Sequence, residues 1–71
     1  MRDLYNCVIG REYHINKLLL DKSECVRLRA LGLNENALVC VSIKNTNGVI
    51  VTVRGVRIAI SKRLSRRIVT K

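Results

Sequence analysis

The sequence predicts a mainly β fold, in which five short strands form a strongly bent sheet and one α-helix follows the first strand. Aliphatic residues alternate with polar ones through Ala37 to Ile60, which is the periodicity of half-buried strands. A glycine marks each of the two turns that divide this stretch. Ser23 to Leu31 instead has apolar residues at three-residue spacing, as on one face of a helix. At 71 residues, we expect one domain spanning 1–71.

Ala37 to Ile60 is predicted to form a three-strand antiparallel meander with one buried face. Its apolar positions are odd up to Val53 and even from Val56 onward. A two-residue loop at Arg54-Gly55 explains this change, because it pairs Val53 with Val56 and keeps the apolar side chains on one face. The predominance of β-branched residues favours the same assignment.

The first hairpin of the meander allows two registers. A two-residue loop at Asn47-Gly48 would place Ile43 opposite Thr52, an apolar residue against a polar one. A three-residue loop from Thr46 to Gly48 pairs Ile43 with Val51 instead, and likewise Val41 with Val53. We therefore expect the three-residue loop.

The segment from Ser23 to Leu31 is the one predicted α-helix. Ser23 can cap it by accepting a hydrogen bond from a free backbone amide of the first turn. Cys25, Leu28 and Leu31 are expected on its buried face. Gly32 is expected to end the helix in the left-handed conformation of a Schellman motif.

The remaining segments complete a small barrel. Met1–Arg11 is a lead-in that places apolar side chains under the sheet, and Tyr13–Leu20 is the first strand. Ser61 can cap a single helical turn with Leu64 pointing inward, and Ile68–Thr70 suits a last strand that pairs with the first. A five-stranded sheet that closes on itself hides its edges, so we expect a small SH3-like barrel.

Charge is the strongest compositional signal. The formal net charge is +9, and all five acidic residues lie in the first 35 positions, where six basic residues accompany them. Residues 36–71 hold eight basic residues and no acidic one. This excess attracts an anionic partner, such as nucleic acid, a phospholipid surface or an acidic protein.

The residues that carry chemistry are few. With one histidine and scattered acids, no nucleophile–base pair or phosphate-binding loop is visible, so we expect no enzyme activity and no cofactor. Cys7, Cys25 and Cys40 are widely spaced and are interpreted as small buried residues, not as a disulfide framework or a metal site. His14 is interpreted as a surface residue, with only Glu12 near it. No membrane span or secretion signal is visible, which favours a cytoplasmic protein.

Two spaced motifs resemble the family of ferrous iron transport protein A (FeoA), and the resemblance covers nearly the whole chain. The first is Arg27-Leu28 followed by Leu31-Gly32-Leu33, and the second is Val53-Arg54-Gly55 followed by Ile58-Ala59-Ile60-Ser61. Further positions with the spacing of the family are Leu4, Gly10, Ile15, Leu18 and Ile68. The chain departs from the family at Asn36, Leu64 and Ser65, and it lacks a proline-containing insertion between the second and third strands.

The resemblance implies an adaptor of bacterial ferrous iron uptake. It would dock on the cytosolic side of the membrane-embedded iron permease, with the GTP-binding domain as one candidate surface, and so lie near the inner face of the membrane. The predicted partner-binding residues, which fall on outward positions or on the terminal turn, are Arg54, Arg57, Lys62, Arg63, Arg66 and Arg67. An arginine acting in trans on GTP hydrolysis is a sharper hypothesis, and a merely solvated basic face is the simpler one.

A nucleic-acid-binding barrel is the alternative function. The eight basic residues of the second half suit a phosphate-binding surface. However, Tyr5 and Tyr13 are far in sequence from the arginines, so stacking aromatic side chains are not expected on the basic face.

Overall fold

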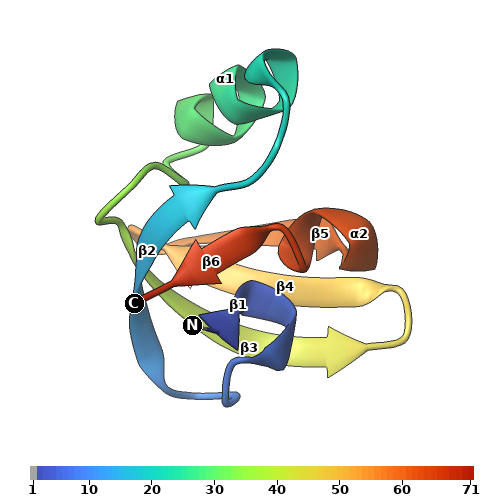
Figure 1. The fold of residues 1–71 in the computed structure, drawn as a ribbon. Helices are drawn as coiled ribbons and strands as arrows, with labels where there is room; N and C mark the ends of the chain where they lie inside the picture. Colours follow the sequence, from blue (N-terminus) through green and yellow to red (C-terminus); the bar gives the residue numbers. More distant parts are fainter. Residues whose placement is uncertain (1) are drawn as a thin grey trace.

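The computed structural model describes residues 2–71, and its strands form one antiparallel sheet in the order β1-β6-β2-β3-β4-β5 (Figure 1). In chain order the elements are β1 (Arg2–Asp3), the 3-10 helix η1 (Leu4–Asn6), β2 (Glu12–Leu18), α1 (Lys22–Ala30), β3 (Leu38–Asn45), β4 (Gly48–Val53), β5 (Val56–Ser61), α2 (Lys62–Ser65) and β6 (Ile68–Thr70). The mainly β fold is confirmed, as are a helix after the first long strand and a last strand paired with it.

The lead-in is more ordered than the sequence suggested. Its described part holds β1 and η1, while Met1 lies outside the described residues. Leu4 and Cys7 are buried under the sheet, but Val8 and Ile9 are exposed. Pairing of β1 with β6 adds a sixth strand, and the hydrogen-bonded ladder of the described residues runs from β1 to β5 without joining these two edges. The sheet is therefore barrel-like but open.

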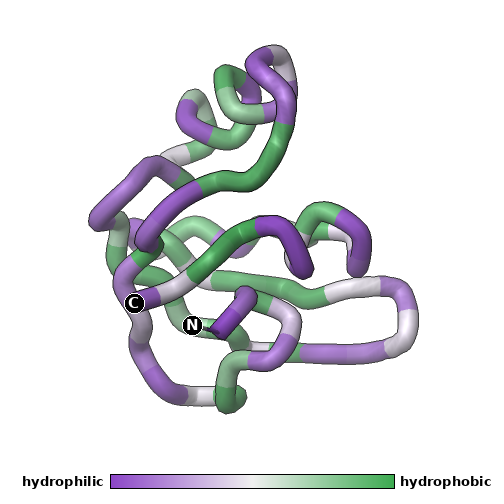
Figure 2. Tube along the Cα trace, viewed as in Figure 1, coloured by the Kyte–Doolittle hydropathy of each residue, from purple (hydrophilic) through white to green (hydrophobic). Residues whose placement is uncertain are grey.

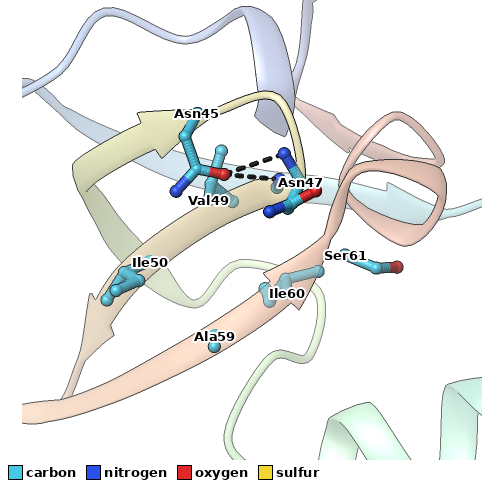
Figure 3. A pocket seen from close by; sticks show the side chains of 8 residues that line it. Asn45, Asn47, Val49, Ile50, Ala59, Ile60 and Ser61 are labelled. Carbon is cyan, nitrogen blue, oxygen red and sulfur yellow. Dashed lines mark hydrogen bonds between the residues drawn. The ribbon is translucent and has the colours of Figure 1, made fainter.

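The second hairpin has the predicted register, with Val53 opposite Val56 across the loop. The first hairpin does not. Asn45 pairs with Gly48 around a two-residue loop, and a bulge between Val41 and Ile43 then shifts the register. The Asn45 side-chain oxygen accepts hydrogen bonds from the Asn47 and Gly48 amides at 2.8 and 3.2 Å, which stabilises this loop (Figure 3).

The bulge changes which residues face the core. Val41 opposes Val51, and not Val53 as predicted, and both Val41 and Val51 are buried, whereas Ile43 opposes Ile50 and is 42% exposed. Val56, also expected inside, is 58% exposed beside the hairpin loop on the edge strand β5. Figure 2 shows hydrophobic residues along β4 and more hydrophilic ones around the loop that joins it to β3.

The helix α1 begins and ends one residue earlier than predicted, and its N-cap residue also differs. Asp21, not Ser23, is the N-cap: its carboxylate accepts a hydrogen bond from the Glu24 amide at 2.9 Å and another from the Ser23 hydroxyl at 3.0 Å. The Schellman ending is confirmed by the hydrogen bond from the Leu33 amide to the Leu28 carbonyl at 2.9 Å. Leu31 is 49% exposed, contrary to the prediction. Each three-residue step along a helix falls about 60° short of a full turn, so Leu31 lies to one side of the buried face that Cys25 and Leu28 share.

We predict that Gly48→Ala destabilises the fold strongly. A Cβ atom at Gly48 would lie 2.1 Å from the Ile60 carbonyl oxygen, and neither backbone can move without breaking the β4–β5 ladder. The expected loss in the free energy of unfolding is at least about 3 kcal/mol by urea denaturation. Gly55→Ala is the control, since it strains a φ of 77° without a clash and should cost about 1 kcal/mol. Equal losses in the two variants would contradict this view of Gly48.

Acid should weaken the fold partly through the α1 cap. The Glu24 amide and then the Ser23 hydroxyl donate to the Asp21 carboxylate and lower its pKa below the ordinary 3.8. A carboxyl whose pKa is lower in the folded state stabilises the fold above its unfolded-state pKa, and this stabilisation is lost as the pH falls through the folded-state pKa. Asp21→Asn keeps a capping oxygen but no titrating group, so we predict a smaller fall in its urea midpoint on acidification. Identical falls would contradict the prediction.

Candidate functional site

The turn α2 is fixed by contacts at both of its ends. The Ser61 hydroxyl accepts a hydrogen bond from the Leu64 amide at 3.2 Å, as predicted for the cap. The Lys62 amide donates to the Asn47 carbonyl at 2.9 Å, which ties the turn to the β3–β4 loop. Leu64 packs against the core, and the buried Ser65 donates its hydroxyl to the Lys62 carbonyl at 2.9 Å. With these two residues inward, the basic residues of the segment face outward.

These basic residues form what we call the α2 basic surface: Lys62, Arg63, Arg66 and Arg67. Together with Asp3 and Leu19 they line a depression of about 750 Å³. The Leu19 amide donates to the Arg67 carbonyl at 2.8 Å, and the Leu19 side chain is 48% exposed. The depression therefore combines an apolar patch with four cationic side chains, and four of the six predicted partner-binding residues lie around it.

The four cations are not equally available. The Arg63 guanidinium forms an ion pair with Glu24 of α1 at 2.5 Å, and the Lys62 ammonium lies 5.2 Å from the centre of the Tyr5 ring. The side chains of Arg66 and Arg67 make no hydrogen bond or ion pair with residues 2–71. A partner could thus pair with these two guanidiniums without breaking an internal contact.

Arg54 and Arg57 lie elsewhere. Arg54 occupies the β4–β5 turn with a φ of 52°, and Arg57 pairs with Thr52 near that end of β5. Ser61 lies four positions after Arg57, which corresponds to about 13 Å along a strand. The six predicted residues consequently form two groups at opposite ends of β5.

Most acidic side chains are occupied within the fold. Asp3 accepts from the Asn6 amide at 3.0 Å at the start of η1, and Asp21 caps α1. Glu24 pairs with Arg63, and Glu35 pairs with Arg29 at 2.8 Å, an ion pair that lowers the pKa of Glu35. Within residues 2–71, Asp3 is the one acidic residue that lines the depression, against four basic residues, and this local excess of positive charge favours binding of an anionic partner.

The expectation that both tyrosines lie away from the basic residues is wrong for Tyr5. Its hydroxyl donates to the Asn45 carbonyl at 2.9 Å, and its ring lies within 5.6 Å of the Lys44 ammonium as well as near Lys62. These contacts hold a single half-buried ring in place. The Tyr13 hydroxyl accepts from the Val8 amide at 3.0 Å, which lowers the Tyr13 pKa.

The thiols and the histidine form no shared site. Cys7 and Cys25 are buried as predicted, and burial raises the pKa of the Cys7 thiol. Cys40 is half-buried and His14 is exposed on β2. Across residues 2–71, no three His, Cys, Asp or Glu side chains gather closely enough to hold a metal ion. No helix within this range has the length and hydrophobicity to span a bilayer.

A second, uncharged groove lies beside the β3–β4 loop. It has a volume of about 290 Å³, and Figure 3 shows Asn45, Asn47 and Ser61 at one end with Ile50 and Ala59 toward the other. Without a charged side chain in its lining, this groove offers nothing that would select an anion or a cation.

Three residues of the α2 region were missed by the sequence analysis: Asp3, Tyr5 and Leu19. The Leu18-Leu19-Leu20 run held a signal for one of them, since strand alternation turns the middle leucine outward when its neighbours are buried or half-buried. Nothing local to Asp3 or Tyr5 indicates a position next to residues about sixty positions later, because the β1–β6 pairing brings them there.

Comparison with known proteins identifies the family. Residues 2–71 match the FeoA domain family, whereas no curated protein matches the chain. A crystal structure of an iron uptake regulatory protein (FeoA) is similar, with a TM-score of 0.88, 27% identity, and coverage of 97% of this chain and 93% of that one.

Two solution structures show the same fold at lower identity. The FeoA protein of Chlorobium tepidum has a TM-score of 0.87 and 17% identity, over 96% of this chain and 67% of that one. Iron(II) transport protein A of Clostridium thermocellum has a TM-score of 0.88 and 15% identity, over 97% of this chain and 44% of that one. The chain therefore belongs to the FeoA domain family, whose members are small accessory proteins of ferrous iron transport.

Proposed function

We propose that this chain is a cytoplasmic adaptor of bacterial ferrous iron uptake, which docks through its α2 basic surface on the cytosolic side of the iron permease. The observation that carries the proposal is the pair of unengaged guanidiniums, Arg66 and Arg67, beside the exposed Leu19. Arginine, with tryptophan and tyrosine, is among the residues enriched at the positions that dominate the binding energy of protein interfaces.

The electrostatics support an acidic docking surface near the membrane. Long-range attraction between the basic residues and acidic groups of the partner speeds the encounter of the two proteins. The inner membrane leaflet is also negatively charged, so it attracts the same basic residues. Arg63 is less available to a partner, because its ion pair with Glu24 links α2 to α1. Docking then depends mainly on Arg66 and Arg67.

Nucleic acid fits the same surface less well. Binding of single strands uses successive aromatic rings as stacking platforms, whereas the α2 region has only Tyr5, whose hydroxyl and ring face are already engaged. A gel shift that is tight and steeply salt-dependent would favour nucleic acid over the adaptor function.

We predict that the double substitution Arg66→Ser/Arg67→Ser weakens binding to the permease in lipid nanodiscs at least about tenfold, since each arginine of such a contact is worth more than about 1 kcal/mol. The matched control is Arg11→Ser/Arg27→Ser, which removes the same charge from two exposed arginines outside the depression. The control should weaken binding less than about threefold, through loss of general attraction alone. Equal weakening by both pairs would show that only net charge matters and would overturn this docking surface.

Docking of this chain on the GTP-binding domain should leave the rate of GTP hydrolysis almost unchanged. An arginine that stabilises the transition state must be held in place, and no hydrogen bond or ion pair within residues 2–71 positions the side chain of Arg66 or Arg67. We predict that saturating amounts of this chain alter the GTP hydrolysis rate less than about threefold, against the thousandfold or greater effect of an inserted arginine finger. A large acceleration that Arg66→Ser or Arg67→Ser abolishes would establish the catalytic role instead.

A further inference from the structure

The strand β5 is an edge strand with no partner on its outer side. It lies last in the sheet order and pairs with β4 through six consecutive residue pairs without a bulge. Its sequence, Val56–Ser61, contains no proline and a single charged residue, Arg57. Natural edge strands are usually protected from further pairing by bulges, prolines or several charges. Most of these protections are missing from β5.

The hairpin register determines which backbone groups are unpaired. In a hairpin with a two-residue loop, the two residues that flank the loop form a hydrogen-bonded pair, and so does every second pair after it. The backbone N–H and C=O groups of Val56 and Ile58 therefore bond to β4. Arg57 and Ala59 alternate with them and direct both their N–H and C=O groups to the free edge. Within residues 2–71, no backbone or side-chain hydrogen bond from outside the β4–β5 pair reaches these groups.

The side chains along this edge show a definite pattern. On the inner face, Val56 is 58% exposed and Ile58 is half-buried, because no strand lies beyond them. On the outer face, the exposed Arg57 and Ala59 alternate with them, and Arg54 projects from the adjoining turn. Residues 54–67 contain six basic residues and no acidic one. An added strand would therefore meet Val56 and Ile58 on one face, and Arg57 with the small Ala59 on the other, near Arg54 of the turn.

We propose that the β5 edge binds an extended peptide segment in which acidic and apolar residues alternate, as an additional strand of the sheet. Backbone hydrogen bonds to Arg57 and Ala59 hold the segment, as in other cases of β-augmentation. Its apolar residues cover Val56 and Ile58, and its carboxylates lie beside Arg57, since directly opposed residues share a face. The inference goes beyond docking on the permease, because it concerns the chemistry of the segment and not the protein that carries it.

A second copy of this chain is a poor occupant. Antiparallel pairing of two β5 strands would bring Arg57 of each copy toward Ser61 and the basic α2 surface of the other. Like charges opposed across paired strands are destabilising. The charge of the edge thus favours an acidic segment over self-association.

The test uses isotope-labelled protein and a synthetic peptide of alternating Glu and Val residues, followed by amide hydrogen exchange. In the free protein, the Arg57 and Ala59 amides should exchange rapidly while those of Val56 and Ile58 are protected. At a peptide concentration ten times its Kd, exchange at Arg57 and Ala59 should slow about tenfold. A peptide of the same composition with its glutamates grouped at one end should give much weaker protection, and so should a Lys-Val peptide.

Three variants separate backbone pairing from charge. Ala59→Pro removes an outward N–H but no bond to β4, and should weaken peptide binding about three- to tenfold, whereas Ala59→Val keeps the N–H and should bind as the unmodified chain does. Arg57→Glu, on an exposed side chain, should weaken binding about tenfold even if Ala59→Pro disturbs the strand.

Several outcomes would overturn the β5 proposal. These are unchanged exchange at Arg57 and Ala59 with peptide bound, equal binding of the grouped peptide, and dimerisation of the protein through β5 in the absence of peptide. If the permease does not bind this chain, the peptide experiment still tests the β5 proposal independently. Conversely, permease binding that Arg66→Ser/Arg67→Ser abolishes and Arg57→Glu leaves unchanged would support docking whatever the peptide does.

Discussion

The contact between the β3–β4 loop and the end of β5 determines where the basic residues point. Gly48 lies so close to the Ile60 carbonyl that no side chain fits there, and the next bond, from the Lys62 amide to the Asn47 carbonyl, fixes the first residue of α2. Asn45 holds the loop in shape through its side-chain oxygen. The orientation of the α2 basic surface thus depends on a short loop, at the place where the chain lacks the proline-containing insertion of the family.

The distribution of charge follows from the needs of the fold. Helix starts require acceptors for their free amides, and the chain uses Asp3 and Asp21 for this purpose. Glu24 and Glu35 are used in ion pairs with single arginines. Because the second half of the chain contains no acidic residue, its remaining basic side chains stay unneutralised at the surface. Most acidic residues are thus engaged within the fold, and the basic residues that they do not neutralise form a surface that can bind a partner.

Much of the fold could be predicted because alternation and turn residues act locally. The β4–β5 register follows from Arg54-Gly55, and the start of α2 follows from Ser61. The β3–β4 register could not be predicted, because it depends on two features that the alternation of apolar residues does not reveal. The Asn45 side chain stabilises a two-residue loop, and a bulge between Val41 and Ile43 shifts the strand pairing. The predicted start of α1 is wrong because Asp21 and Ser23, two positions apart, both have side chains that can cap a helix. The division of the six basic residues into two groups likewise needs the geometry of β5, because sequence proximity alone treats them as one cluster.

The most direct measurement of the central claim is site-specific photo-crosslinking in cells that express the iron permease. A photoreactive phenylalanine derivative would replace Leu19 in the depression of the α2 basic surface, and a matched chain would carry it at His14 on the exposed face of β2. The account predicts a permease adduct from position 19 and little or none from position 14. Adducts that form from position 14 and not from position 19 would contradict it.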